Sequence, residues 1–341
     1  MLLVFNPLSF ILNPLSKMFD FFNTWMQAGG WWVAAALLVV GFLLLVLGAD
    51  WLVDGASGLA KRYHVSDLVI GLTIVAMGTS MPEFVVNMAS IGNGSTDLAI
   101  TNALGSNILN IFLILGSTAL LYPIVSQATS RRVDIPLAAL AGVLVLLFGL
   151  FCEGIPRWGG ILLLLIFMGY MYYTFRHAKA GSEQEETFRP MKLWRALLLI
   201  VLGLAGLILG GEMIVKSAVH IAQQAGVSEA LIGLTIVALG TSLPELATSL
   251  IAAAKKNCDI ALGNVVGSNI FNVFMILGCS AAIKPLPSYP GFVLDSIMAA
   301  LGCVLVWVFV MTNKKHQIRW WHGAIMLIVY GGYLGWRLVT A

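Results

Sequence analysis

Residues 71–83 read GLTIVAMGTSMPE, and residues 233–245 read GLTIVALGTSLPE. The similarity continues without a gap over residues 71–116 and 233–278, where 23 of 46 positions are identical at a constant offset of 162. Shared apolar composition explains matching Leu, Ile and Val residues. It does not explain Gly-Thr-Ser-x-Pro-Glu followed in register by Asn-x-x-Gly-Ser-Asn-Ile-x-Asn. The chain therefore contains an internal repeat.

The composition around the repeat is that of a membrane protein. Only 10% of the 341 residues are charged and 59% are hydrophobic, whereas a soluble protein has about 25% charged residues. Apolar runs of about 20 residues, enough to span a bilayer as a helix, recur along the chain. These features exclude a soluble enzyme, a disordered chain and a nucleic-acid-binding module. We expect an all-α polytopic membrane protein with ten transmembrane helices. Their predicted ranges are 31–60, 67–91, 96–122, 133–152, 157–176, 193–222, 229–254, 259–283, 291–311 and 319–339.

A polar segment halfway along the chain, residues 177–192, predicts a cytoplasmic linker. It separates a first five-helix half, residues 31–176, from a second, residues 193–341. Because five is odd, the second half must enter the membrane upside down relative to the first. Inverted repeats are typical of secondary transporters, although some channels also have them.

The basic residues predict the orientation. Of the 19 Lys and Arg residues, 14 fall in loops on one side of the predicted membrane and 3 on the other. Positive loops stay cytoplasmic, so we predict an inner (plasma) membrane protein with both termini outside, in the periplasm.

The prefix, residues 1–30, is apolar, contains Pro7 and Pro14 and lacks a basic start, so it matches a cleavable signal peptide poorly. Two alternatives remain for the prefix. It forms an interfacial helix, or translation starts at Met26 and the residues before it are not part of the protein.

Glu83 and Glu245 fall about halfway through their predicted spans. An ionisable residue there costs at least about 2.5 kcal/mol on insertion scales, so it normally faces a partner or a polar cavity. Neither repeat span has a Lys or Arg at that depth, and Lys216 alone cannot neutralise both glutamates. Ion binding is therefore a better interpretation than a structural ion pair.

Pro82 and Pro244 precede the glutamates. Each removes a helical hydrogen bond and frees the carbonyl four residues earlier, at Gly78 and Gly240. The same motifs supply hydroxyl groups, from Thr79, Ser80, Thr241 and Ser242.

The next span of each repeat has a polar stripe at i, i+4 and i+8. The stripes are Asn102, Ser106, Asn110 and Asn264, Ser268, Asn272. Facing each other, the two halves offer an all-oxygen cage with a charge near −2, which suits Ca²⁺ and Na⁺. Asn102 and Asn264 serve equally well as hydrogen-bonding residues between helices.

Four charged residues lie on the first and sixth spans: Asp50, Asp54, Glu212 and Lys216. We interpret them as structural or gating residues. Asp54 and Lys216 occupy equivalent repeat positions, which suggests a pair across the pseudo-twofold axis.

With these motifs the sequence closely resembles the cation/calcium antiporter superfamily, whose sodium/calcium exchangers carry paired α-repeats with GTSxPE and GSN segments. The resemblance covers about residues 31–339. It implies two inverted five-helix halves in which the long, tilted first and sixth spans slide against a rigid eight-helix core.

The resemblance also implies roles for single residues. Glu83 and Glu245 would be the central calcium ligands, together with the backbone carbonyls of Thr79 and Thr241. The sodium sites would be lined by the Ala76 and Ala238 carbonyls and by Ser80, Ser106, Ser242, Ser268 and Asn110. Some members have Asp where this chain has Asn110 or Asn272. The amides lower the negative charge, so we expect transport that does not depend on K⁺.

The expected function is electrogenic Na⁺/Ca²⁺ antiport by alternating access. We expect no enzyme activity, no cofactor besides the transported ions, no nucleic-acid partner, and a monomer in the lipid bilayer. A proton/cation antiporter and a cation channel are the alternatives. An intramembrane enzyme is more remote, because no nucleophile or metal cluster accompanies the glutamates.

Overall fold

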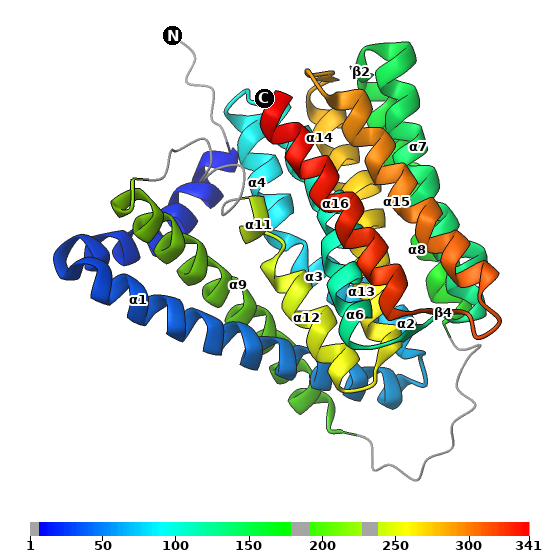
Figure 1. Ribbon diagram of the computed structural model, residues 1–341, viewed down its shortest axis with the longest axis horizontal. Coiled ribbons are helices and arrows are strands. Elements are labelled where there is room, and N and C mark those ends of the chain that lie inside the picture. The colour runs from blue at the N-terminus through cyan, green and yellow to red at the C-terminus, as the bar shows by residue number, and fades with distance from the viewer. Residues whose placement is uncertain (1–6, 179–190, 227–237, 341) are drawn as a thin grey trace.

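The computed structural model describes residues 7–178, 191–226 and 238–340. The described chain is built from helices and two short strand pairs (Figure 1). The fold class is the one expected, an all-helical polytopic membrane protein.

Three of the helices in the first half are π-helical and are labelled η. The helices of this half are α1 (Pro7–Tyr63), α2 (Asp67–Ile70), η1 (Gly71–Val75), α3 (Ala76–Thr79), α4 (Met81–Gly92), α5 (Thr96–Ile108), η2 (Leu109–Leu115), α6 (Gly116–Leu121), η3 (Ser130–Asp134), α7 (Ile135–Cys152) and α8 (Arg157–His177). Those of the second half are α9 (Leu193–Gln224), α11 (Ala238–Gly240), α12 (Leu243–Ala254), α13 (Cys258–Ile270), η5 (Phe271–Leu277), α14 (Gly278–Ile283), α15 (Phe292–Thr312) and α16 (Trp320–Thr340).

Seven of the described helices are long and apolar enough to cross a membrane. The pair Asp67–Thr79 and Met81–Gly92, bent by 46° at its break, adds an eighth span. Ten spans also require α16 and the segment that ends in α12, whose preceding residues, 227–237, lie outside the described chain. Most of the predicted linker, residues 179–190, lies outside it too. The count of ten and the division into halves stay predictions.

Two strand ladders join the halves. The strands are β1 (Ile124–Val125), β2 (Gly154–Ile155), β3 (Leu286–Pro287) and β4 (Gln317–Ile318). β1 pairs with β4, with Ile124 opposite Ile318, and β2 pairs with β3, with Ile155 opposite Leu286. Ile124 lies 162 positions before Leu286, and Ile155 lies 163 before Ile318. Each half therefore lends its partner the same two strands, as a pseudo-twofold relation requires.

Figure 1 shows α1 and α9 side by side at one flank of the molecule, inclined to the other helices. Glycines let the two backbones approach. A Cβ atom added to Gly48 would lie 2.7 Å from the Leu207 nitrogen, and one added to Gly210 would lie 2.6 Å from the Gly41 carbonyl oxygen. Gly41 and Gly48 are the repeat equivalents of Gly203 and Gly210. The crossing is thus built twice from one glycine spacing, as in close-packed membrane helices.

The prefix continues α1 backwards to Pro7, across a break at Gly30 (φ 64°, ψ −155°). A left-handed backbone of this kind favours glycine. Ahead of the break, Phe22 and Met26 pack with Leu37 of α1 and Met213 of α9. The prefix is therefore a helix that contacts both long helices. Its place at a membrane interface and a translation start at Met26 stay predictions.

The suggested pair between Asp54 and Lys216 does not form. Asp54 Oδ1 lies 2.6 Å from the ammonium nitrogen of Lys255, which also lies 2.7 Å from Asp50 Oδ1. The reason is the antiparallel crossing, in which Gly55 packs against Ile200. Lys216 comes sixteen residues after Ile200, or about 24 Å further along α9. Equivalent positions of inverted halves lie toward opposite ends of the crossing.

The crossing makes a prediction about stability. Gly48→Ala should destabilise the protein by about 1–3 kcal/mol, because the new methyl group meets backbone atoms that cannot turn aside. Gly331→Ala is the matched control, since nothing lies within 4 Å of a Cβ atom added there. Thermal unfolding of the two purified variants in detergent checks this. Equal midpoints for both would contradict the close crossing.

Candidate ion-binding site

Both repeats break a helix at the same motif position. α3 ends at Thr79 and α4 begins at Met81, with Ser80 between them at φ −84° and ψ 8°. The second repeat breaks at Ser242, with φ −91° and ψ 4°. Irregular backbone at membrane depth is tolerated where it is buried in protein or lines a polar cavity.

The residues after each break fit the start of a helix. Pro82 and Pro244 are the second residues of α4 and α12, and a residue without an N–H group is tolerated in the first turn of a helix. Glu83 and Glu245 follow in the first turn. The positive end of the helix dipole favours a negative charge at that place.

Both carboxyl groups are fully buried, and their hydrogen bonds cross between the halves. Ser80 Oγ donates to Glu245 Oε1 over 2.9 Å, and Ser242 Oγ donates to Glu83 Oε1 over 3.4 Å. Ser106 Oγ donates to Glu83 Oε1 over 3.3 Å and lies 3.3 Å from Ser242 Oγ. Neither half alone builds the site.

Five buried side-chain oxygens of the predicted site residues have no hydrogen-bond partner in the described part of the chain. They are Glu83 Oε2, Glu245 Oε2, Asn110 Oδ1, Asn272 Oδ1 and Ser268 Oγ. Buried oxygens without partners are uncommon because they forfeit hydration. Ca²⁺ takes about 6–8 oxygen ligands of these types. The five oxygens are therefore the atoms that a cation would satisfy.

The charge of the pair is not balanced from within the described chain. None of the ion pairs between described residues includes Glu83 or Glu245. Lys216 lies beside Glu212, one turn away on α9. Two buried carboxylates without a fixed cation are costly, so the site calls for cations or protons from solution.

Asn102 and Asn264 bind helices together. The Asn102 amide donates to the Glu83 carbonyl oxygen over 3.3 Å, and the Asn264 amide donates to the Glu245 carbonyl oxygen over 3.2 Å. The Thr79 hydroxyl donates to Asn264 Oδ1 over 3.0 Å. These bonds favour the interhelical interpretation for both asparagines, which hold the first turns of the glutamate helices in place.

The expected backbone ligands differ between the halves. The Ala76 carbonyl oxygen accepts a hydrogen bond from the Ser80 N–H over 3.0 Å. A cation that binds this oxygen would share it with that N–H group. In the second half the Ser242 N–H donates over 3.2 Å to Leu239 rather than to Ala238. Thr241, which is half-buried, lies beside the Glu83 carboxyl group.

Asn107 and Asn269 belong to the site architecture, although the sequence did not single them out. Each amide donates over 3.2 Å to the backbone carbonyl of the other. A carbonyl only accepts, so these bonds fix which end of each amide is NH₂. Asn110 Nδ2 then donates to Asn269 Oδ1 over 3.1 Å, and Asn272 Nδ2 donates to Asn107 Oδ1 over 3.0 Å.

This relay orients the amides of Asn110 and Asn272. Their NH₂ groups are committed to the relay, so their oxygens are left without partners. A flipped amide would place a donor where a cation needs an acceptor. The signal was present in the sequence, since both copies of the repeat contain Gly-Ser-Asn in register.

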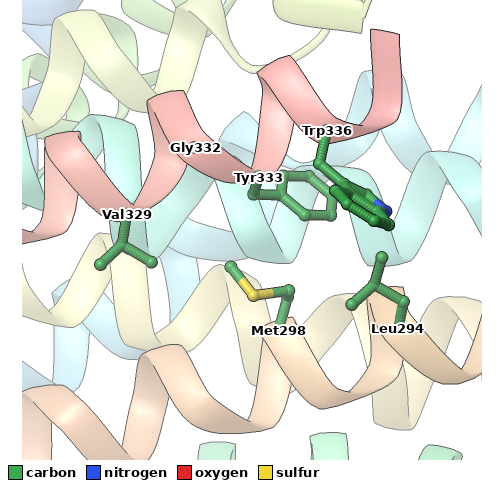
Figure 2. A pocket seen from close by; sticks show the side chains of 6 residues that line it. All are labelled: Leu294, Met298, Val329, Gly332, Tyr333 and Trp336. Carbon is green, nitrogen blue, oxygen red and sulfur yellow. The ribbon is translucent and has the colours of Figure 1, made fainter. Parts of the chain in front are cut away.

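A cavity of about 230 Å³ lies elsewhere, between α15 and α16 (Figure 2). Its lining is apolar and consists of Leu294, Met298, Val329, Gly332, Tyr333 and Trp336. No residue of the two repeats lines it, so it is not the ion site.

The chain is similar to known ion exchangers and antiporters. The family model described as "Sodium/calcium exchanger protein" matches residues 33–176 and 195–339. The chain is 41% identical to CaxA of Alkalimonas amylolytica over 295 residues, 84% of this chain and 92% of that protein. It is 30% identical to the sodium/calcium exchanger MaX1 of Methanosarcina acetivorans over 330 residues, 84% of this chain and 93% of that one. The solved sodium-calcium exchanger NCX_Mj, soaked with 2.5 mM Na⁺ and 1 mM Sr²⁺, matches with a TM-score of 0.78 and 31% identity, over 89% of this chain and 97% of that chain.

The relay predicts a graded loss of cation affinity. Asn107→Ala should raise the apparent KM for Ca²⁺ by about tenfold, the lower end of the range for residues that orient metal ligands. Asn313→Ala is the control, because its amide also donates to a backbone carbonyl, that of Gln317, but outside the repeats. Calcium uptake into proteoliposomes at graded Ca²⁺ concentrations gives both values. An unchanged KM in Asn107→Ala would remove the relay from the site.

Proposed function

The chain belongs to the sodium/calcium exchanger protein family, and from that premise we propose that it exchanges Na⁺ for Ca²⁺ electrogenically and without K⁺. It is a multi-pass membrane transporter of the cation/calcium antiporter type, not an enzyme. The proposal needs no cofactor besides the transported ions.

The observation that carries the proposal is the pair Glu83 and Glu245, buried on broken helices with oxygens left unsatisfied. A site with a charge near −2 matches one Ca²⁺. The neutral oxygens of Ser268, Asn110 and Asn272 extend the site without adding charge. Na⁺ ions spread over the same oxygens can replace Ca²⁺, because both are hard cations that prefer oxygen ligands.

Exchange rather than leak follows from the cost of the empty site. Two bare carboxylates that cross the low-dielectric barrier pay a large desolvation penalty. A site filled by Ca²⁺ or by several Na⁺ avoids that penalty. The protein should therefore switch the site between the two sides of the membrane only when ions occupy it. This requirement couples the flow of Na⁺ to the flow of Ca²⁺.

The two amides bear on stoichiometry and on K⁺. Asn110 and Asn272 stand where carboxylates would raise the negative charge of the site. The relay accepts hydrogen bonds from the NH₂ groups of both amides, which carboxylates could not donate. Three Na⁺ per Ca²⁺ then move one net positive charge per cycle. A site of this lower charge supports exchange that does not need K⁺ as a third ion.

The remaining elements of the proposal concern its setting. The distribution of basic residues supports a plasma (inner) membrane protein with both termini periplasmic and the linker cytoplasmic. A working monomer is part of the proposal. With an inward sodium gradient, the expected direction is calcium efflux.

Reconstituted protein tests the proposal. An outward Na⁺ gradient should drive ⁴⁵Ca²⁺ into proteoliposomes, and a membrane potential that is negative outside should speed this uptake by favouring the outward movement of net positive charge. Replacing K⁺ by choline, with the potential held fixed, should leave the uptake unchanged.

Two outcomes would contradict the proposal, and each would indicate a different function. Uptake that follows a pH gradient and ignores the Na⁺ gradient would make the protein a proton/cation antiporter. Ion currents far above carrier turnover, without coupling, would make it a channel.

The glutamates make a further prediction. Glu83→Gln or Glu245→Gln should abolish exchange while the protein stays folded, since a buried amide is less costly than a buried carboxylate. Glu153→Gln is the matched control, because Glu153 is exposed at the end of α7. Initial ⁴⁵Ca²⁺ uptake rates and gel-filtration profiles provide the readouts. If Glu83→Gln retained exchange, Glu83 would not be a central calcium ligand.

A further inference from the structure

A second group of buried oxygens without partners lies between η3 and α8. Asp134 is 4% exposed, and its Oδ1 accepts a hydrogen bond from the Tyr170 hydroxyl over 2.9 Å. Asp134 Oδ2, Ser130 Oγ and Thr174 Oγ1 have no partner in the described chain. Ser130 and Thr174 are 1% and 5% exposed.

These four side chains meet at one contact. Ser130 lies four residues before Asp134, and Thr174 lies four residues after Tyr170, so each pair shares a helix face. The Tyr170–Asp134 hydrogen bond brings the two faces together. None of the ion pairs between described residues includes Asp134. The contact therefore holds a buried carboxyl group and hydroxyl oxygens, and no cation of the described chain forms an ion pair with the carboxyl group.

The second half contains the same contact. Residues 134–142 read DIPLAALAG and residues 295–303 read DSIMAALGC, which aligns Asp134 with Asp295. Residues 158–170 read WGGILLLLIFMGY and residues 321–333 read WHGAIMLIVYGGY, which aligns Tyr170 with Tyr333. The Tyr333 hydroxyl donates to Asp295 Oδ1 over 2.8 Å, as Tyr170 donates to Asp134.

In the second half, a guanidinium group supplies the positive charge. Arg337 Nη2 lies 3.4 Å from Asp295 Oδ2. Gly291 makes room for it, since a Cβ atom there would collide with the Arg337 guanidinium. In the first half, Thr174 stands at the position of Arg337 and Ser130 at that of Gly291. The first half thus replaces a cation and a space by two hydroxyl groups.

We propose that a monovalent alkali cation, Na⁺ or K⁺, binds there in the place of the missing guanidinium. Its ligands are Asp134 Oδ2, Ser130 Oγ and Thr174 Oγ1. One carboxylate balances one single charge, and hydroxyl and carboxylate oxygens are the ligands that hard cations take. The ion joins η3 and α7 to α8, as the Arg337–Asp295 pair joins α15 to α16. The site shares no residue with the one around Glu83 and Glu245.

Thermal unfolding of the purified full-length chain tests the proposal, in a background carrying Glu83→Gln and Glu245→Gln that disables the central site. Exchanging N-methylglucamine chloride for NaCl or KCl at equal ionic strength should raise Tm by a few degrees, because an ion that binds only the folded state stabilises it. Asp134→Asn should abolish this rise. The double variant Ser130→Gly, Thr174→Arg should abolish it as well but keep a high Tm in N-methylglucamine, since the arginine then acts as Arg337 does.

Three results would overturn the proposal. They are a Tm that ignores alkali cations, an alkali effect that survives in Asp134→Asn, and a Tm that rises on acidification in place of cation addition, which would make the occupant a proton. If the glutamine background does not fold, the Asp134→Asn comparison is made in the otherwise unchanged chain. Sodium-driven calcium flux is measured separately, so loss of this site and loss of the exchange function are distinguishable.

Discussion

The structure depends on the burial of two carboxylates that form no ion pair with any cation of the described chain. Glu83 and Glu245 are fully buried, and a charge in such a place must be neutralised by something that binds. The helix breaks at Ser80 and Ser242 bring the glutamates to helix starts, and the hydroxyl groups that reach them come partly from the opposite half. The two halves must therefore be packed together before either carboxylate has all its hydrogen-bond partners.

Duplication explains how the chain builds this site, and departures from duplication show what is not required twice. The glycines of α1 and α9, the exchanged strands and the Asn107–Asn269 relay all follow the repeat. The ion pairs do not. Lys255 binds Asp50 and Asp54, whereas its repeat equivalent is the uncharged Asn93. The two central glutamates are thus duplicated, whereas the cation of the Lys255 ion pairs is not.

Much of this could be predicted from the sequence, because bilayer thickness and periodic apolar runs leave few alternatives. The span predicted at 259–283 is found at Cys258–Ile283, and the residues around Glu83 and Glu245 lie together as the repeat indicated. What failed or was missed depends on three-dimensional relations. The Asp54–Lys216 pair was wrong because equivalent positions of inverted halves lie toward opposite ends of the crossing between α1 and α9. The role of Asn107 depends on which amide end meets a carbonyl, which spacing does not reveal.

Equilibrium binding of ⁴⁵Ca²⁺ to the purified protein tests the central claim most directly, since it asks whether the buried pair holds a cation at all. In Na⁺-free buffer the account predicts one bound Ca²⁺ per chain, displaced by added Na⁺ and absent from Glu83→Gln and Glu245→Gln. Binding that persists in both variants, or that Na⁺ does not displace, would contradict it.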